Sequence, residues 1–594
     1  MGRGSSIRSL ADLDAGEDLS ADVLVIGGGP AGLTVARELG GSGREVLLLE
    51  SGGLDEDPSA EDLNTTRAEP GNWSPAQEAR RRDYHGDQTR LWSHETQGYG
   101  VRCRLMGGST QSWAGKSAAF DDIDYEARDW VPNSGWPIDA AELEDPLEQA
   151  AKALNLGPNC YGDALWDRLR RDPPQPEPDR AVLGSFFWQF ARSTIAPMEV
   201  MQCGREFLKA MPAHVRVLTG ATVLELLTTG DGQGIRAVRV ADGTGRQREI
   251  AARTVVLAAS AIENARLLLA SRATHRNGIG NAHDAVGRYL MDHPCAVVAR
   301  FAPDDITRMA AHYGFFGLKT DQGVAMYMRG LAPSAQVQRR EGLLNCAAFM
   351  PGVRAADDPL PAAKRLVKRQ SDRPLEDLRA VLRSPGIVAK GLGRMAVQSR
   401  HVPKGLSRFA VEQVVRFRPG FAAEEYLTGG MPHKLVGLDI QAVCEQVPEP
   451  ENRVRLADET DRHGQPLPLV RWKVGAAEMR TLARFGGLIA EEFARAGLPV
   501  PVIEDWIRDG QGDVAVIDMA HSAGTTRMSA DPAKGVVDAD CRVHGMANLY
   551  VAGASVFPTS GHANPTLMIV ALATRLAGHL GQQAKARSAA RNAA

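Results

Sequence analysis

The sequence has few of the residues and runs that mark several large classes of protein. Its 594 residues include only seven cysteines, which are scattered and form no CxxC pair. An odd, scattered set of thiols predicts neither a disulfide framework nor a zinc site, and it favours a reducing compartment. No stretch approaches the ~20 apolar residues of a membrane-spanning helix. Residues 1–22 contain no apolar run that could serve as a signal-peptide core, so we expect a cytoplasmic protein.

Excess charge and several catalytic motifs are also missing. The formal net charge is -3, which gives the whole chain no electrostatic attraction to nucleic acid. A serine hydrolase would need a GxSxG elbow, and the sequence has none. His, Cys and carboxylate residues are not spaced as metal ligands, so no metal site is expected. Hydrophobic residues make up 43% and charged residues 24%, which is ordinary for a globular chain with more than one core.

The clearest local signal lies at residues 22–53, DVLVIGGGPAGLTVARELGGSGREVLLLESGG. A short apolar strand, Val23–Ile26, leads into a loop that fits GxGxxG, and the apolar spacing after it predicts a helix. Gly27 permits the tight turn, Gly29 lets backbone approach a pyrophosphate, and Gly32 lets the helix pack on the strand. A second strand ends at Glu50, where a carboxylate can hydrogen-bond a ribose diol. The segment predicts a dinucleotide site and disfavours NADP.

Later segments predict more of this sheet and then a different one. Arg253–Ser271 again combines a short apolar strand with an apolar-faced helix, so it should add a strand to the nucleotide-binding sheet. Between about Pro294 and Gly510, alternating segments such as HKLVGLDIQAVCEQV predict an antiparallel sheet. The segment AAEMRTLARFGGLIAEEFARAGL predicts an amphipathic helix. We expect a second domain built into the first.

One stretch of the chain is unusually basic. Residues 361–420 contain 14 Lys and Arg but only four acidic residues, with leucines and valines at helical spacing. A basic amphipathic insertion can lie on a membrane surface or bind an acidic partner. A solvated helical insertion or a subunit contact explains the same composition, and we favour this simpler interpretation.

The C-terminal segments DMAHSAGTTRM and GHANPT, taken with GGGPAGL and Glu50, resemble the glucose–methanol–choline (GMC) family of FAD-dependent oxidoreductases. Segments MGGSTQSWAG, DWVPNSGWPID and VGRYLMDHP extend the resemblance in the same order along the chain. It is greatest to the pyranose-oxidase branch and related bacterial sugar-alcohol oxidoreductases. The implied fold is α/β: a Rossmann-type FAD-binding domain with an inserted α+β substrate domain on an antiparallel sheet. The corresponding segments are 18–294 and 511–594 for FAD and 295–510 for substrate.

The resemblance also implies a catalytic pair. The histidine of the family falls on His521, and the second residue, histidine or asparagine, falls on Asn564. His562 is the alternative base, while His293 and His544 are expected to be structural. Asn564 is also expected to cap a buried helix that starts at Pro565.

FAD contacts follow from the same resemblance. Some pyranose oxidases attach their flavin through a histidine at the position of Ser112, and a serine cannot form that bond, so non-covalent FAD is expected. The N–H groups of Thr566 and Leu567, at a helix N-terminus, are candidates to face the flavin. The expected cofactor-binding residues are Gly27, Gly29, Gly32, Glu50, Gly108, Ser109, Thr110, Val223, Gly553, Ala554, Asn564, Pro565 and Thr566.

The chemistry implied is oxidation of an alcohol on a polyhydroxylated substrate. His521 would accept the hydroxyl proton and flavin N5 the hydride, with oxygen or another molecule as the final acceptor. Sugars, glycosides and amino-sugars all suit this reaction, and an amino-sugar would need acidic residues such as Glu424 and Glu425. Two alternatives stay open: a lyase that holds FAD structurally, and a non-catalytic flavoprotein that docks to a partner.

Overall fold

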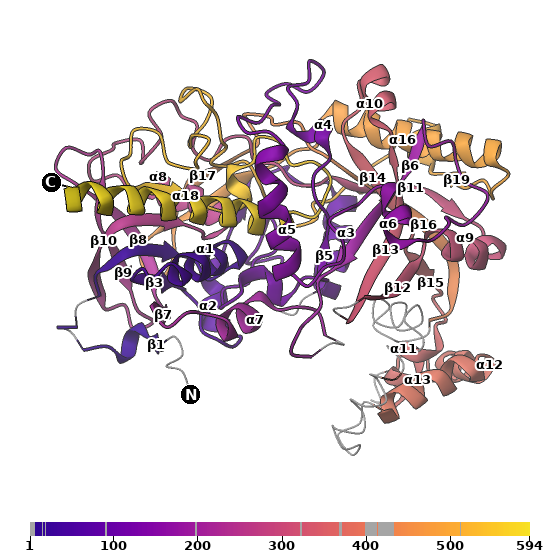
Figure 1. Ribbon diagram of the computed structural model, residues 1–594. Helices are drawn as coiled ribbons and strands as arrows, with labels where there is room; N and C mark the ends of the chain where they lie inside the picture. The colour runs from indigo at the N-terminus through magenta and orange to yellow at the C-terminus, as the bar shows by residue number, and fades with distance from the viewer. Residues whose placement is uncertain are drawn as a thin grey trace.

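The computed structural model describes residues 6–14, 16–17, 19–88, 92–196, 199–320, 323–367, 371–397, 413, 433–510 and 512–593. Two large sheets form the framework. Figure 1 shows the eight-stranded sheet at one end of the molecule, with the N-terminal elements and the yellow C-terminal helix, and the nine-stranded sheet at the other. Elements from the beginning and the end of the chain therefore belong to the same sheet.

The eight-stranded sheet has the doubly wound pattern that the glycine loop predicts. Strands β2 (Ala21–Ile26) and β3 (Val46–Leu49) are almost wholly buried, as expected for parallel strands covered by helices on both faces. The predicted returning strand is present, because β10 (Gln247–Leu257) pairs in parallel with β2. The order is β1 (Ser6–Ser9), β7 (Val215–Thr219), β3 (Val46–Leu49), β2 (Ala21–Ile26), β10 (Gln247–Leu257), β9 (Ile235–Ala241) and β8 (Thr222–Thr228), with β20 (Leu549–Val551) also on β10.

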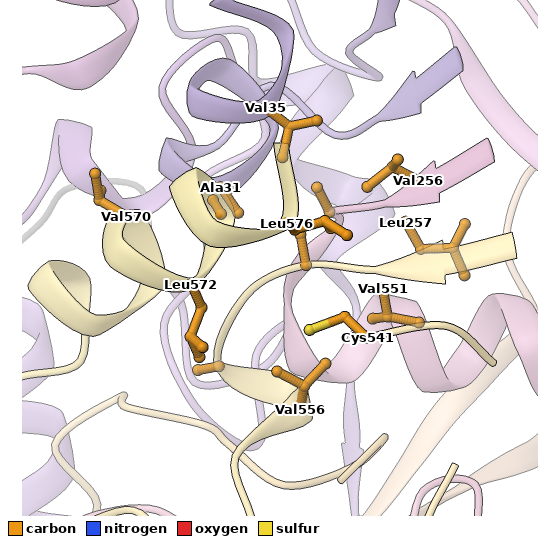
Figure 2. Close-up of a cluster of buried hydrophobic side chains, with 14 of the residues drawn as sticks. Ala31, Val35, Val256, Leu257, Cys541, Val551, Val556, Val570, Leu572 and Leu576 are labelled. Atoms are coloured by element: carbon orange, nitrogen blue, oxygen red, sulfur yellow. The ribbon is translucent and has the colours of Figure 1, made fainter. Parts of the chain in front are cut away.

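Two helices from opposite ends of the chain cover this sheet. Helix α1 (Pro30–Gly41) follows the glycine loop, and α18 (Thr566–Ala593) follows the GHANPT segment. Figure 2 shows Ala31 of α1, Val256 of β10 and Leu576 of α18 in one apolar cluster. Full burial of a valine or leucine side chain contributes about 1.5–3 kcal/mol. This packing fixes the beginning of α18 beside the glycine loop.

The nine-stranded sheet is largely antiparallel, as the alternating pattern predicts. The apolar face of α16 (Ala476–Ala496), including Phe485 and Ile489, packs into the core beside it. The order is β19 (Val502–Ile503), β11 (Cys295–Phe301), β16 (Leu435–Cys444), β14 (Cys346–Phe349), β13 (Gly323–Pro333), β6 (Leu183–Phe190) and β5 (Lys116–Ser117), with β12 (Phe315–Thr320) on β13 and β15 (Gly352–Arg354) on β16.

The sheets do not follow the three predicted chain segments. Strands β5 and β6 lie within 18–294 but belong to the nine-stranded sheet. Strands β17 (Arg453–Thr460) and β18 (Pro466–Arg471) lie within 295–510, yet they form a small separate sheet with β4 (Arg67–Ala68). Strand pairing depends on which apolar faces meet, and chain order does not reveal this. The segment boundaries remain a prediction.

The basic stretch begins with three helices that project from the nine-stranded end in Figure 1: α11 (Pro359–Val367), α12 (Pro374–Arg383) and α13 (Pro385–Val397). On α12, Leu375 is 71% exposed and Leu382 is 69% exposed. Glu424 and Glu425 lie outside the described residues, and so does most of 398–432. The favoured interpretation of this stretch, a solvated helical insertion or a subunit contact, remains a prediction. None of the helices in the described ranges is both long and apolar enough to span a membrane.

The remaining helices connect these parts. They are α2 (Pro58–Glu61), α3 (Pro75–Gln88), α4 (Asp122–Tyr125), α5 (Glu144–Ala153), α6 (Ala164–Leu169), α7 (Cys203–Lys209), α8 (Ser260–Ala270), α9 (Ile306–Tyr313), α10 (Ala335–Glu341) and α17 (Asp505–Arg508).

Candidate active site

The glycine loop leaves open space at the N-terminus of α1. A Cβ on Gly27 would lie 2.4 Å from the Ala258 carbonyl oxygen, and one on Gly32 would lie 1.9 Å from the Gly27 carbonyl oxygen. A Cβ on Gly29 would meet no atom within 4 Å. Two of the glycines therefore serve packing of the chain on itself, whereas Gly29 faces space that the protein does not fill.

The carboxylate of Glu50 lies at the edge of this space. Its two oxygens accept hydrogen bonds from the N–H groups of Gly28 at 2.7 Å and Gly52 at 2.8 Å. A carboxylate oxygen has two lone pairs, so each oxygen can still accept one more hydrogen bond. The side chain is held rigidly with acceptor capacity to spare, as binding of a ribose diol requires.

A second tight turn packs on the glycine loop. The N–H of Gly107 donates to the Gly28 carbonyl at 2.7 Å, and Gly108 has φ +54°. A Cβ on Gly108 would lie 3.3 Å from the Gly29 Cα. Ser109 is exposed, whereas the Thr110 hydroxyl donates to the Gly107 carbonyl at 2.6 Å. The hydroxyl of Thr110 therefore already has a hydrogen-bond partner within the protein.

Other predicted cofactor residues lie around the same loop. Gly553 has φ +111°, and its hypothetical Cβ would lie 3.9 Å from the Ala31 Cβ, while Ala554 begins the short helix that follows. Thr566 is the first residue of α18. Val223 lies on β8, next to Thr222, whose hydroxyl is 2.8 Å from that of Ser51 after β3. These contacts bring the loop after β20 to α1, and β8 to the segment that follows β3.

The two predicted catalytic side chains touch each other. Nδ2 of Asn564 lies 3.2 Å from Nε2 of His521. On the other side of the ring, Nδ1 of His521 lies 2.9 Å from Nδ1 of His293, and Nε2 of His293 lies 3.3 Å from the Ser560 carbonyl oxygen. His293 was expected to be structural. Its direct contact with His521 could not be predicted from the residues around either histidine.

This chain of contacts fixes the protons on both rings. A carbonyl oxygen can only accept, so Nε2 of His293 carries a hydrogen. Burial lowers the pKa of His293 to about 3, so at neutral pH the ring is neutral and its Nδ1 is an acceptor. Nδ1 of His521 must then donate to it. Burial, with His293 and Lys116, also lowers the pKa of His521 well below its ordinary value, so Nε2 of His521 is unprotonated and accepts a hydrogen bond from Nδ2 of Asn564.

Asp292 holds both histidines in place through their backbone. Its carboxylate accepts from the N–H groups of His293 at 2.7 Å and of Met519 and His521 at 2.9 Å each. Burial, with the charge of Asp518, raises the pKa of Asp292 to about 7, although the three N–H donors oppose that rise. One side chain thus ties the segment of His293 to the segment of His521.

Comparison with known proteins places these features in a family. A sequence model described as FAD-dependent oxidoreductase matches residues 22–279. A second one, described as GMC oxidoreductase, matches residues 448–573. The chain belongs to the GMC oxidoreductase family. It is an FAD-dependent oxidoreductase.

Individual GMC relatives match along most of the chain. The chain is similar to a 6'''-hydroxyparomomycin C oxidase of Streptomyces lividus, with 24% identity over 94% of this chain and 92% of the relative. It is similar to the fructose dehydrogenase large subunit of Gluconobacter japonicus, with 24% identity over 94% of this chain and 98% of the relative. The crystal structure of pyridoxine 4-oxidase from Mesorbium loti matches with a TM-score of 0.52 and 16% identity, over 94% of this chain and 99% of that chain.

These comparisons confirm the predicted family and fold class, an FAD-binding Rossmann-type unit with a second unit built on a sheet. The relatives are named as oxidases and dehydrogenases, which does not favour a lyase or a docking protein. The GMC cofactor fits the chain: open space at Gly29 and spare acceptors on Glu50 suit a dinucleotide. No group of His, Cys, Asp and Glu that could hold a metal ion occurs in the described part of the chain.

The start of α18 differs by one residue from the prediction. The carbonyl of Pro565 accepts from the N–H of Ile569 at 2.8 Å, and the helix begins at Thr566. Pro565 therefore occupies the cap position, since a cap residue's carbonyl accepts the first bond of the helix. Asn564 precedes the cap, and its amide is directed to His521 instead.

Three further residues singled out in the sequence do not contact the predicted catalytic pair in the hydrogen bonds of the described residues: His544, His562 and Ser112. Ring nitrogen Nε2 of His544 lies 3.0 Å from the Ser529 carbonyl oxygen, which agrees with a structural role. His562 is 2% exposed, and neither ring nitrogen has a hydrogen-bond partner among the described residues. The Ser112 hydroxyl lies 3.1 Å from Sγ of Cys103.

Proposed function

We propose that this GMC oxidoreductase oxidises a CH–OH group of a polyhydroxylated substrate, with His521 as the base. The observation that supports this most is the unprotonated Nε2 of His521, whose lone pair accepts from the amide of Asn564 until a substrate hydroxyl takes that place. A base must be unprotonated before it can accept a proton, and a partner that donates to the substrate oxygen stabilises the developing alkoxide. This pair supplies both groups at one point.

The proton transfer follows from the tautomers. The substrate hydroxyl donates to Nε2 of His521, and Nδ2 of Asn564 donates to the substrate oxygen. When Nε2 takes the proton, the positive charge is shared with Nδ1–H, which keeps its hydrogen bond to His293. The negative charge of Asp518 favours this protonated form. Bound FAD supplies the acceptor for the hydride that leaves the carbinol carbon, so the alcohol becomes a carbonyl.

The cofactor is held without a covalent bond in this proposal. Gly27, Gly29 and the free N–H groups at the start of α1 receive the pyrophosphate. Glu50 receives the ribose, and Val223 lies toward the adenine. Ser112 stands where a flavin-linking histidine would be needed, and a serine cannot form that link.

The substrate class rests on the relatives. Among the relatives named above, one is named for a paromomycin derivative and one for fructose, both rich in hydroxyl groups. A sugar, glycoside or amino-sugar therefore fits the proposed chemistry, and the pyranose-oxidase-like branch is the proposed place of this chain within the family.

The test is anaerobic mixing of the holoenzyme with sugars, glycosides and amino-sugars while the flavin absorbance is recorded. Bleaching by one class is expected, and it should be slowed in His521→Ala by about 100- to 10,000-fold, the range of general acid–base catalysis. His579→Ala, which changes a partly exposed histidine on α18, is the matched control and should react normally. Normal bleaching in a His521→Ala protein that retains FAD would refute the assignment.

A further inference from the structure

A lysine amine lies near the candidate catalytic pair, and burial lowers its pKa to about 7. Nζ of Lys116, on β5, lies 4.1 Å from the centroid of the Trp188 ring and 3.7 Å from that of the Phe349 ring. Within the described ranges, no carboxylate pairs with this ammonium. Buried charges are normally paired, and an unpaired amine loses its proton more easily, as the lowered pKa of Lys116 shows. An anionic ligand would complete this site by holding the amine in its charged form.

The aromatic residues around Lys116 form a continuous wall. Ring centroids of Trp188 and Phe349 are 5.8 Å apart, those of Trp188 and Phe186 are 4.7 Å apart, and those of Phe186 and His562 are 4.6 Å apart. Nε1 of Trp188 and both ring nitrogens of His562 are buried without a hydrogen-bond partner among the described residues. Most buried polar atoms are paired in native proteins, so three such atoms beside the Lys116 ammonium point to a missing ligand.

This wall borders the candidate catalytic pair. His562 is two residues from Asn564, and the charge of Lys116 helps to lower the pKa of His521 and of His562. Lys116, His521 and Asn564 keep part of their surface accessible, whereas burial dominates the pKa shifts of Lys116 and His521. These side chains are therefore partly accessible although they lie among other protein atoms.

Acidic residues near the candidate catalytic pair already have partners. Asp518 accepts from Nε of Arg81 at 2.6 Å, and Asp292 accepts from three backbone N–H groups and the Tyr99 hydroxyl. Asp124 accepts from Nδ2 of Asn345 at 2.9 Å, and burial raises its pKa well above the ordinary value. These three acids are therefore poorly placed to balance a cationic substrate, whereas an anionic one would meet Lys116.

We propose that Lys116 binds an anionic group, specifically a carboxylate, on a polyhydroxylated substrate whose ring packs on the wall of Phe186, Trp188 and Phe349. The preferred substrate class is then a sugar acid and not an amino-sugar. This inference rests on the proposed alcohol oxidation at the same site. A carboxylate on Lys116 forms a charge-assisted hydrogen bond, which is about twice as strong as a neutral one.

The test separates binding from turnover. Binding is measured in the His521→Ala holoenzyme from the perturbation of the flavin spectrum by D-glucuronate, D-glucose and D-glucosamine. Glucuronate is expected to bind most tightly, and Lys116→Met in the same background should weaken it by about 10- to 100-fold, as loss of a charged hydrogen bond predicts. Methionine preserves length and aromatic contact. Lys209→Met, at the exposed end of α7, is the control and should change nothing.

Each outcome has a defined meaning. Loss of affinity in Lys116→Met that is equal for all three probes, or stronger binding of glucosamine than of glucuronate, would overturn the carboxylate site. Selective loss for glucuronate supports it, whether or not wild-type enzyme oxidises the probe. If glucuronate binds through Lys116 but no sugar acid bleaches the wild-type flavin, the carboxylate site stands and the proposed oxidation fails.

Discussion

Replacement of His293 tests the tautomer chain most directly. In His293→Leu, Nδ1–H of His521 loses its acceptor at 2.9 Å in a buried site. An unpaired buried donor costs about 1–3 kcal/mol, so the ring should shift its hydrogen to Nε2, where the Asn564 amide oxygen can accept after rotation. At about 1.4 kcal/mol per factor of ten, the reactive tautomer falls about 5- to 150-fold. The rate of flavin reduction should fall by the same factor.

His293→Gln is the matched control for this experiment. A glutamine amide offers one oxygen to accept from Nδ1–H of His521 and one NH2 to donate to the Ser560 carbonyl. Because glutamine keeps one acceptor for His521 and one donor for Ser560, the rate of flavin reduction should stay within about 5-fold of wild type by the same estimate.

The assay is anaerobic stopped-flow reduction of the flavin, with FAD content and thermal unfolding recorded for each variant. Nitrogen-15 NMR of labelled histidine would report the tautomer of His521 directly. Equal loss in His293→Gln and His293→Leu, or no loss in His293→Leu, would refute the proton assignment and return His293 to a purely structural role.

Three further changes test the cofactor space, the buried imidazole and the buried ion pair. Gly29→Ala should leave the unfolding of the FAD-free protein unchanged but weaken FAD about 10- to 100-fold in a titration, whereas Gly32→Ala should destabilise the protein with or without FAD. Burial lowers the pKa of His562 to about 3, so between pH 6.5 and 3 the unfolded chain binds more protons than the folded protein. Stability therefore decreases as the pH is lowered through that window. His562→Phe should remove about 1.4 kcal/mol of the loss between pH 7.5 and 5.5 in chemical unfolding. Arg81→Met leaves Asp518 buried without its guanidinium and should cost about 3–5 kcal/mol by the same method, and an effect below about 1 kcal/mol would contradict this.

Local patterns in the sequence predicted the nucleotide-binding half well. The glycine loop and Glu50 lie within one strand–helix–strand unit, and each residue's role depends on neighbours a few positions away. The same is true of α16, whose apolar spacing is a property of one segment.

What the sequence did not reveal depends on contacts between distant segments. His293 and His521 are 228 positions apart, and a lone histidine in VGRYLMDHP carries no sign of its partner. Lys116 follows the glycine-rich turn in sequence, but its proposed role depends on contacts with Trp188 and Phe349 on two other strands. Membership of β5 and β6 in the second sheet has the same origin, because pairing is decided by the fold.

The position of α18 also has a consequence for biosynthesis. Its apolar face packs on α1, and β20 joins β10, so elements made late complete a sheet whose first strands were made early. The proposed catalytic residues His521 and Asn564 lie in the same late part of the chain. A nascent chain can pair β2 with β3 before it contains the proposed base. Until β20 and α18 have been made, the apolar faces of α1 and β10 remain uncovered and in need of protection from aggregation.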